Sequence, residues 1–348
     1  MDFSTLLIYS MFMLISVTLA FISQHCSQPK NKLLFITVTY LFVVAFWGIR
    51  YNIGFDYKNY IEIYYEIKHG ETSYVEPVYF FLCLIFSTVT SGEYYVIAAM
   101  SVITYWALFL FLLKKNILWQ GLFFSLVFQF QFMAANQVRQ ALAVALFLVL
   151  LPYIEKKQRI KWIAGVLIIS FFCHASALFL LLLIPFCRIN LSGKKWCLIL
   201  SILYILYLGG FFRNFGNILL TNFPLPENYQ HFLLTDWMEA EEVGFSLVML
   251  FNVLVALYVA WNYKMDDKRI FTLYMLGMCL YIVFVEYHLL LRLSFYLYYI
   301  NIYVVSLYCK EKKSGRIILI ISFLFFLFNC AQSTSLHGTI PYKTLLSK

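Results

Sequence analysis

The residues of this sequence most able to do chemistry are ionisable side chains within or beside long apolar runs. A charge placed in a membrane span costs at least about 2.5 kcal/mol on insertion scales, so an ionisable residue found there is a functional candidate. A guanidinium offers a planar fork of donors for a phosphate, and a carboxylate or imidazole can accept a proton from a hydroxyl. The candidates of these two kinds are Arg50, Asp56, Glu76, Arg139, His174 and Arg292.

Arg50 opens a dense polar stretch that follows an apolar run and extends to Tyr60. Gly54 permits a turn, and Asp56 can cap a following helix. Aromatic and apolar residues then recur at helical spacing, namely Tyr57, Tyr60, Ile61 and Tyr64. The pattern predicts a short amphipathic helix on the membrane surface. The alternative is that Arg50 only snorkels to the interface and that the aromatic residues form an interfacial belt.

A second polar group, Gln129-x-Gln131 and Asn136-Gln137-x-Arg139-Gln140, borders a helix predicted over 134–154. On that helix Asn136, Arg139 and Gln140 share one face, which suits a phosphate or sugar hydroxyls. The alternative is that the amides hold neighbouring helices together.

Three further polar residues or groups interrupt apolar segments. His174 lies among small residues in Cys173-His174-Ala-Ser-Ala, and Glu76 precedes Pro77 at the start of an apolar segment. The histidine could be a packing residue, and the glutamate a first-turn helix acid. A third group forms a helical stripe of polar and aromatic side chains, namely His288, Arg292, Tyr296 and Tyr299.

The composition determines which elements must position these residues. The chain has 348 residues, of which 63% are hydrophobic and 12% charged, whereas soluble domains carry about 25% charged residues. The apolar runs are continuous, unlike the alternating segments of a β-barrel. We therefore predict an all-α polytopic membrane bundle, a single integral-membrane domain over 1–348 with about ten to twelve spans. Two longer outer loops are expected, over about 50–74 and 213–243.

The distribution of positive charge predicts an orientation. The net charge of +9 fits basic cytoplasmic loops, and no basic stripe with interleaved aromatics indicates nucleic acid. All basic clusters can face the cytoplasm only if two segments do not cross, and the best candidates are 75–90 and 162–186. That arrangement places 50–74, 213–243 and the other polar groups on one outer face. Because non-spanning segments are tolerated only where they line a cavity, it also predicts a cavity there.

No cofactor or metal is expected. The eight cysteines are scattered without a Cys-x-x-Cys pair, and no clustered carboxylates suggest a hard-metal site. Motifs of phosphate loops, nucleophile elbows and zinc proteases are also missing from the sequence. Arginines can stabilise a pyrophosphate leaving group in place of a metal.

Several short motifs follow one another in the order found in one protein family. They are Arg50 with Gly54-Phe-Asp56-Tyr57-x-x-Tyr60, Glu76-Pro77-Val-Tyr-Phe, Arg139-Gln140-Ala-Leu-Ala, His174-Ala-Ser-Ala, Arg292-Leu-Ser-x-Tyr296 and Pro341-Tyr-Lys343. From about residue 48 to 343, the sequence resembles the EpsG family of Wzy-type bacterial surface-polysaccharide polymerases.

The resemblance implies a reaction at the periplasmic face of the inner membrane. Oligosaccharide repeat units linked to undecaprenyl pyrophosphate are joined without a metal, and the lipid pyrophosphate is the leaving group. A flippase and a chain-length regulator are possible partners. We expect Arg50, Arg139 and Arg292 to hold the pyrophosphate, and Asp56, Glu76 or His174 to act as the base. Contacts to sugar or lipid are expected from Tyr57, Tyr60, Gln137, Gln140, His288 and Tyr296.

Other classes of membrane protein remain as alternatives. A flippase for the same lipid-linked unit would also line a cavity with arginines, although the two-fold repeat typical of many transporters is not evident. An O-antigen ligase or a multi-spanning acyltransferase is the other alternative.

Overall fold

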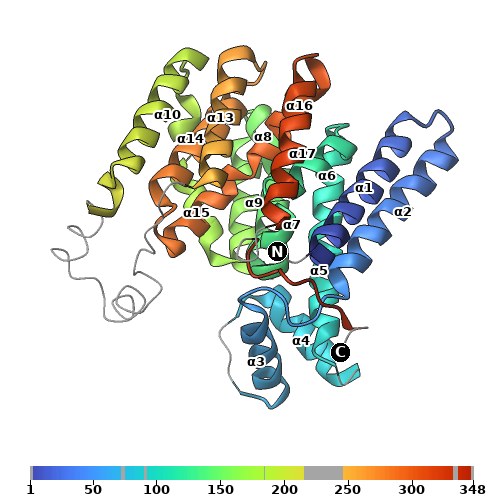
Figure 1. Cartoon of the computed structure of the whole chain (residues 1–348). Helices are drawn as coiled ribbons and strands as arrows, with labels where there is room; N and C mark the ends of the chain where they lie inside the picture. Colours follow the sequence, from blue (N-terminus) through green and yellow to red (C-terminus); the bar gives the residue numbers. More distant parts are fainter. Residues whose placement is uncertain are drawn as a thin grey trace. The chain divides into compact units, whose positions relative to one another are not determined.

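A computed structural model describes residues 3–71, 75–89, 92–183, 185–214, 246–331 and 336–345 (Figure 1). Every named element within these residues is a helix, which confirms the prediction of an all-α polytopic membrane protein. The described helices that are long and apolar enough to cross a membrane number five, or six with one bent pair. They are α1 (Phe3–His25), α2 (Pro29–Gly48), α5 (Tyr94–Lys114), α8 (Val138–Glu155), the segment Leu290–Glu311 and the bent pair α6 (Leu118–Val127) and α7 (Phe130–Asn136).

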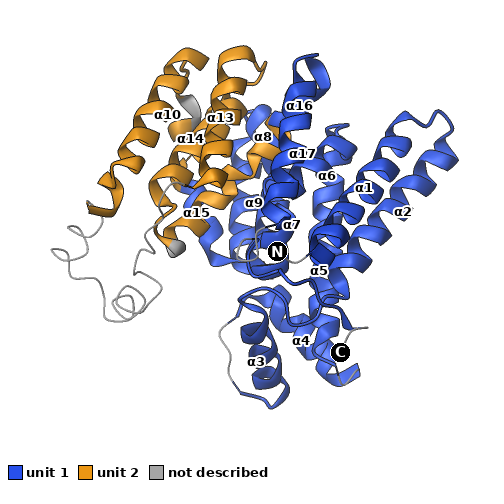
Figure 2. Cartoon of the chain, viewed as in Figure 1, with its two compact units in different colours: residues 1–181, 305–348 blue, residues 182–304 orange. Residues whose placement is uncertain are grey.

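The chain forms two compact units (Figure 2). Unit 1 comprises 1–181 and 305–348, and unit 2 comprises 182–304. The prediction of a single integral-membrane domain stays a prediction.

The helices of unit 1 pack both on their neighbours along the chain and on helices that are distant in sequence. Helix α1 packs on α2 and α6 (Leu118–Val127), α2 packs on α5, and α5 on α8. Helix α9 (Arg159–Phe172) packs on α8, and α17 (Gly315–Ala331) on α1. Aromatic side chains fill the α1–α2 interface, where the Phe12 and Phe46 rings stack with centroids 3.9 Å apart.

The span predicted to start at residue 134 is divided differently in the structure. Helix α6 is followed by α7 (Phe130–Asn136), and the two are bent by 63° at a break. Gln129 lies in the break with a left-handed φ of 63°. Helix α8 begins only at Val138, after Gln137 with φ −107° and ψ 65°. The prediction that Asn136 shares a helical face with Arg139 is therefore wrong, because the chain leaves helical geometry between them.

The two segments predicted not to cross are short or interrupted. Helix α4 (Pro77–Val89) has 13 residues and is about 20 Å long, less than the about 30 Å of a bilayer core. It packs against α3 (Tyr57–Lys68), the predicted amphipathic helix. Helix α9 ends at Phe172, and 3-10 helices follow over Ala175–Leu183 and Pro185–Arg188. The non-crossing topology stays a prediction that these lengths favour.

Unit 2 contains α10 (Gly193–Leu208), α13 (Leu247–Asn262) and α14 (Lys268–Phe284). Helix α10 packs on both α13 and α14, and α14 packs on α15 (His288–Tyr298). Helix α16 (Ile300–Glu311) runs from unit 2 into unit 1. Of the predicted loop 213–243, all but the first two residues lie outside the described part of the chain.

We expect Gly277→Ala to destabilise unit 2, because α14 and α15 touch there through their backbones. A Cβ on Gly277 would lie 2.5 Å from the carbonyl carbon of Leu297, so the helices must separate. Such overpacking typically costs about 1–3 kcal/mol. The matched control is Gly48→Ala, whose Cβ would meet nothing closer than 3.6 Å. Thermal unfolding of the purified protein in detergent should show a lower midpoint for Gly277→Ala alone; equal midpoints would contradict the packing argument.

Candidate functional site

A carboxylate joins distant parts of unit 1 at one point. Arg139 Nη1 lies 2.5 Å from Glu76 Oε2. The other oxygen, Oε1, lies 3.4 Å from His174 Nδ1 and accepts the Ala175 N–H at 3.3 Å. The exposed fractions of the three side chains lie between 15% and 26%, so the cluster is partly desolvated yet still reachable. The structure thus brings together three of the predicted site residues.

Helix ends place these side chains. Glu76 immediately precedes α4, and Arg139 is the second residue of α8. His174 lies in the break between α9 and the following 3-10 helix. The first turn of α8 has no side-chain cap from Gln137. Because uncapped N–H groups carry the positive end of the helix dipole, this end of α8 adds to the positive potential of Arg139.

Tyr60 completes one wall of the cluster. Its ring centroid lies 5.7 Å from the Arg139 guanidinium carbon, within the range of a cation–π contact. The Tyr79 hydroxyl donates a hydrogen bond to the Tyr60 carbonyl at 3.0 Å, which ties α3 to α4. Tyr60 and Tyr57 are both buried on the same face of α3. The predicted aromatic face is therefore turned into the protein and holds Arg139.

The imidazole of His174 has two kinds of neighbour at one nitrogen. Nδ1 lies 3.4 Å from Glu76 Oε1, and 3.4 Å from the Ser176 backbone nitrogen. A carboxylate only accepts and an amide N–H only donates. With Nδ1 protonated, the ring donates to Glu76 and Nε2 is the basic nitrogen; with Nδ1 unprotonated, it accepts the Ser176 N–H instead.

The polar loop after α2 lies against the chain just before Arg139. The Asp56 N–H donates to Asn136 Oδ1 at 2.8 Å. Gly54 has a φ of +95°, and a Cβ there would lie 3.0 Å from the Ala135 carbonyl oxygen. Asp56 precedes α3 but makes no side-chain capping bond, so the predicted capping role is wrong. Its backbone instead connects the loop to the end of α7.

A family comparison gives this geometry its context. The sequence model of the EpsG family matches residues 33–344, nearly the whole chain. The chain belongs to the EpsG family. Members of this family are polysaccharide-polymerase-like membrane proteins, so this chain is a membrane protein of polysaccharide biosynthesis. Neither the curated proteins nor the solved structures contain a match.

In this EpsG family member Arg50 is buried beneath the loop rather than exposed at an edge. The residue is 1% exposed, and Nη1 donates to the Trp47 carbonyl at 2.5 Å and to Ser101 Oγ at 2.9 Å. Nε and Nη2 have no hydrogen-bond partner among the described residues. Burial lowers the pKa of Arg50, and the nearby Tyr105 and Tyr57 hydroxyls oppose that shift. A pyrophosphate role for Arg50 stays a prediction.

The C-terminal motif of the family acts as a strap over the Arg50 loop. The Tyr51 N–H donates to the Lys343 carbonyl at 3.0 Å, and the Leu345 N–H donates to the Ile49 carbonyl at 2.9 Å. Tyr342 stacks on Phe46 with ring centroids 4.5 Å apart. The contacts of this tail show that it fixes the loop that leads to α3.

The remaining predicted residues divide between the two units. Gln137 and Gln140 flank Arg139 and are buried, with exposed fractions of 6% and 1%. In α15 of unit 2, Tyr296 is buried and Arg292 partly exposed, whereas the His288 side chain lies outside the description. The prediction that Arg292 binds the same ligand as Arg139 stays a prediction.

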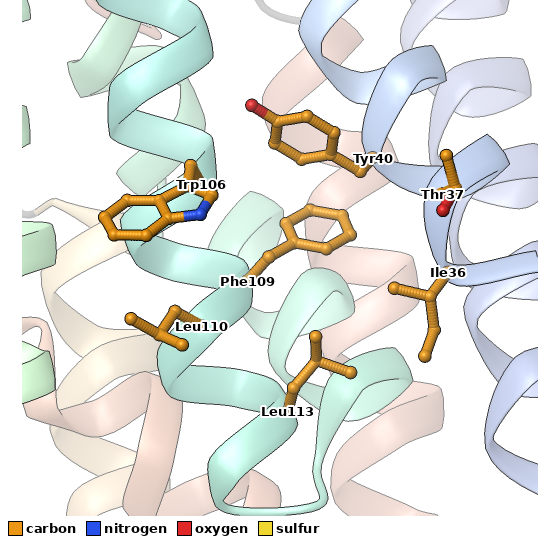
Figure 3. Close-up of a pocket in the computed structure, with 7 residues that line it drawn as sticks. All are labelled: Ile36, Thr37, Tyr40, Trp106, Phe109, Leu110 and Leu113. Atoms are coloured by element: carbon orange, nitrogen blue, oxygen red, sulfur yellow. The ribbon is translucent and has the colours of Figure 1, made fainter. Parts of the chain in front are cut away.

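A shallow apolar groove of about 190 Å³ lies between α2 and α5 (Figure 3). No charged side chain lines it, and both helices are candidate membrane spans. The groove therefore has no ionisable group comparable to those of the Glu76 cluster. Its apolar lining suits a hydrocarbon chain. Its lining residues are Ile36, Thr37, Tyr40, Trp106, Phe109, Leu110 and Leu113. Elsewhere, the described residues contain no group of three potential metal ligands.

Proposed function

We propose that this EpsG family member polymerises oligosaccharide repeat units that are linked to undecaprenyl pyrophosphate. A hydroxyl of the acceptor unit attacks the anomeric carbon of the donor glycan. The bond from that carbon to the pyrophosphate oxygen breaks, and the lipid pyrophosphate leaves with the electron pair. The hydroxyl proton passes to a base on the protein. Neither a nucleotide sugar nor a metal takes part in this scheme.

The observation that carries the proposal is the meeting of Arg139, Glu76 and His174 at one partly exposed point. Arg139 lies in the first turn of a helix whose amides are not capped by the preceding side chain. A guanidinium and a helix N-terminus are the two protein features best suited to a pyrophosphate. Their positive charge stabilises the negative charge that develops as the pyrophosphate leaves.

Glu76 and His174 supply the proton acceptor in this scheme. Glu76 holds Arg139 through one oxygen and faces His174 Nδ1 with the other. A carboxylate on Nδ1–H leaves Nε2 as the basic nitrogen, the arrangement that general-base catalysis by histidine requires. Asp56 is the alternative base, because its backbone is tied to Asn136 near Arg139.

The direction of α8 favours a periplasmic site. Arg139 lies at its start, whereas Lys156 and Lys157 follow its end. Lys115, which follows α5, pairs with Glu155 at that same end. Because basic loops face the cytoplasm, the Arg139 end faces the periplasm of a bacterial inner membrane. A flippase that delivers the lipid-linked unit and a chain-length regulator are the expected partners.

The test is a gel of surface polysaccharide from a strain that lacks this gene, with and without the wild-type gene restored. A polymerase predicts a ladder that collapses to a single repeat unit and returns with the gene. Surface glycan without any repeat unit would indicate a flippase, and polymer not attached to lipid A core a ligase. An unchanged ladder with altered acetyl content would indicate an acyltransferase. Each of these three outcomes contradicts the proposal.

A further inference from the structure

Unit 2 contains a charged pair that the proposed mechanism does not use. Arg213 Nη2 and Nε lie 3.0 and 3.3 Å from Glu286 Oε1. Arg213 follows α10, and Glu286 lies in the turn between α14 and α15. The pair therefore joins two helix ends, and its two residues are 73 positions apart in the chain.

Glu286 is the more buried member of this pair. Its side chain is 2% exposed, whereas that of Arg213 is 28% exposed. Both Arg213 nitrogens bond to Oε1, and Oε2 is buried without a hydrogen-bond partner among the described residues. Leaving a buried charged acceptor unpaired is costly, so a donor is needed at Oε2.

Tyrosines hold and border the pair. The Tyr287 hydroxyl donates to the Phe212 carbonyl at 2.9 Å and to the Arg213 carbonyl at 3.2 Å. These bonds fix the backbone of Arg213 to the residue that follows Glu286. Tyr207, near the end of α10, is buried and stacks on Tyr204 with ring centroids 6.0 Å apart. The Tyr287 bonds thus tie the chain after α10 to the turn that carries Glu286.

The chemistry of the cluster selects one class of ligand. A divalent cation needs several carboxylates, and no group of three potential ligands occurs among the described residues. A free anion is opposed by the Glu286 carboxylate. A neutral donor of hydrogen bonds remains, and sugar hydroxyls are such donors. Arg213 can also donate to sugar oxygens from its exposed side.

We propose that Glu286 and Arg213 form a sugar subsite, in which Glu286 Oε2 accepts a hydrogen bond from a hydroxyl of the acceptor glycan. This inference rests on the proposed function, because a membrane protein that joins lipid-linked oligosaccharides must recognise an acceptor. Glu286 is then a specificity residue, separate from the Arg139 cluster that binds pyrophosphate.

The experiment measures binding to the full-length protein in nanodiscs with two probes. One is the lipid-linked single repeat unit isolated from the polymerase-deficient strain, and the other is undecaprenyl pyrophosphate without a glycan. Glu286→Gln should weaken binding of the first probe by about tenfold, the typical effect of one hydrogen bond to a charged group. It should leave binding of the second probe unchanged. Arg139→Ala should weaken binding of both.

Two control variants separate a sugar contact from a structural tie. Tyr287→Phe removes the bonds to the Phe212 and Arg213 carbonyls but keeps the carboxylate. It should lower the thermal midpoint and leave the ratio of the two affinities as in wild type. Should Glu286→Gln fail to fold, Arg213→Lys is the substitute, because it keeps the positive charge but loses the forked donors of the guanidinium. This variant should show the same selective loss of binding to the glycan-bearing probe.

Unfavourable results distinguish this subsite from the proposed function. If Glu286→Gln keeps the wild-type affinity ratio while Arg139→Ala weakens both probes, the subsite is overturned and the proposed function stands. If the wild-type protein binds neither probe, both proposals are overturned.

Discussion

Replacing Arg139 with alanine is expected to collapse the polysaccharide ladder to a single repeat unit at unchanged protein level. Arg139 is the arginine paired with Glu76, and it lies in the first turn of α8, whose N-terminal amides are not capped by the Gln137 side chain. In the proposed reaction it stabilises charge that appears only as the pyrophosphate leaves. Removing one such donor typically lowers the rate about 100- to 1,000-fold.

Arg139→Lys tests whether the shape of the guanidinium matters beyond its charge. An ammonium cannot hold Glu76 and a pyrophosphate oxygen in one plane, so we expect only partial recovery of the ladder. Lys115→Ala is the matched control, since it removes a cation paired with Glu155 at the other end of the helices. Normal polymer length with Arg139→Ala would exclude Arg139 from the reaction; a loss with Lys115→Ala would show that any broken ion pair has this effect.

The residues of the Glu76 cluster can be found from the sequence because a charged side chain in an apolar segment is energetically costly and therefore conspicuous. Glu76, Arg139 and His174 lie within or beside apolar segments, and that observation selects them together with Arg50, Asp56 and Arg292. Continuous apolar runs likewise predicted the all-α membrane class. The aromatic spacing predicted the helix α3 and its aromatic face, which includes Tyr60, but placed that face on the membrane surface and not against the protein. These features are local, so the order of residues along the chain is sufficient to reveal them.

Features that depend on distant contacts could not be found this way. The break at Gln129 occurs at a residue type with no strong turn signal. It is accompanied by bonds of the neighbouring Gln131 to Trp47 Nε1 and Ser125 Oγ, both at 2.7 Å. Trp47 is far from Gln131 in the sequence, and Ser125 lies across the bend. The helical spacing of the sequence therefore reveals neither contact. The separation of Asn136 from the helix of Arg139 follows from a second irregular position, Gln137.

The Arg213–Glu286 pair shows the same limit for site residues. In the sequence, Glu286 merely precedes the helical stripe that begins with His288. Its actual partner is 73 residues away, and nothing in the pattern around Arg213 indicates the pairing. The strap formed by Tyr342 and Lys343 joins the C-terminus to the end of α2 in a similar way. In both cases only the folded chain reveals which polar groups form hydrogen bonds or ion pairs with one another.

Glu76→Gln is expected to abolish polymerisation to nearly the same extent as Arg139→Ala. The amide preserves the shape of the side chain but removes the charge that faces both Arg139 and His174 Nδ1. His174→Ala should lose about 100- to 10,000-fold in rate if His174 is the general base. The measurement is polymer formation by the purified protein from lipid-linked single units.

The double variant decides whether the two residues act together. Groups that work as a unit show strongly non-additive losses, so Glu76→Gln with His174→Ala should be no slower than the slower single variant. Glu155→Gln, which breaks the ion pair with Lys115, should retain wild-type activity. If His174→Ala is active while Glu76→Gln is not, His174 is not the proton acceptor, and that acceptor must be sought at Glu76 itself or at Asp56. Additive losses would instead mean that Glu76 and His174 contribute to separate steps, because the orientation of the imidazole would then not depend on the carboxylate.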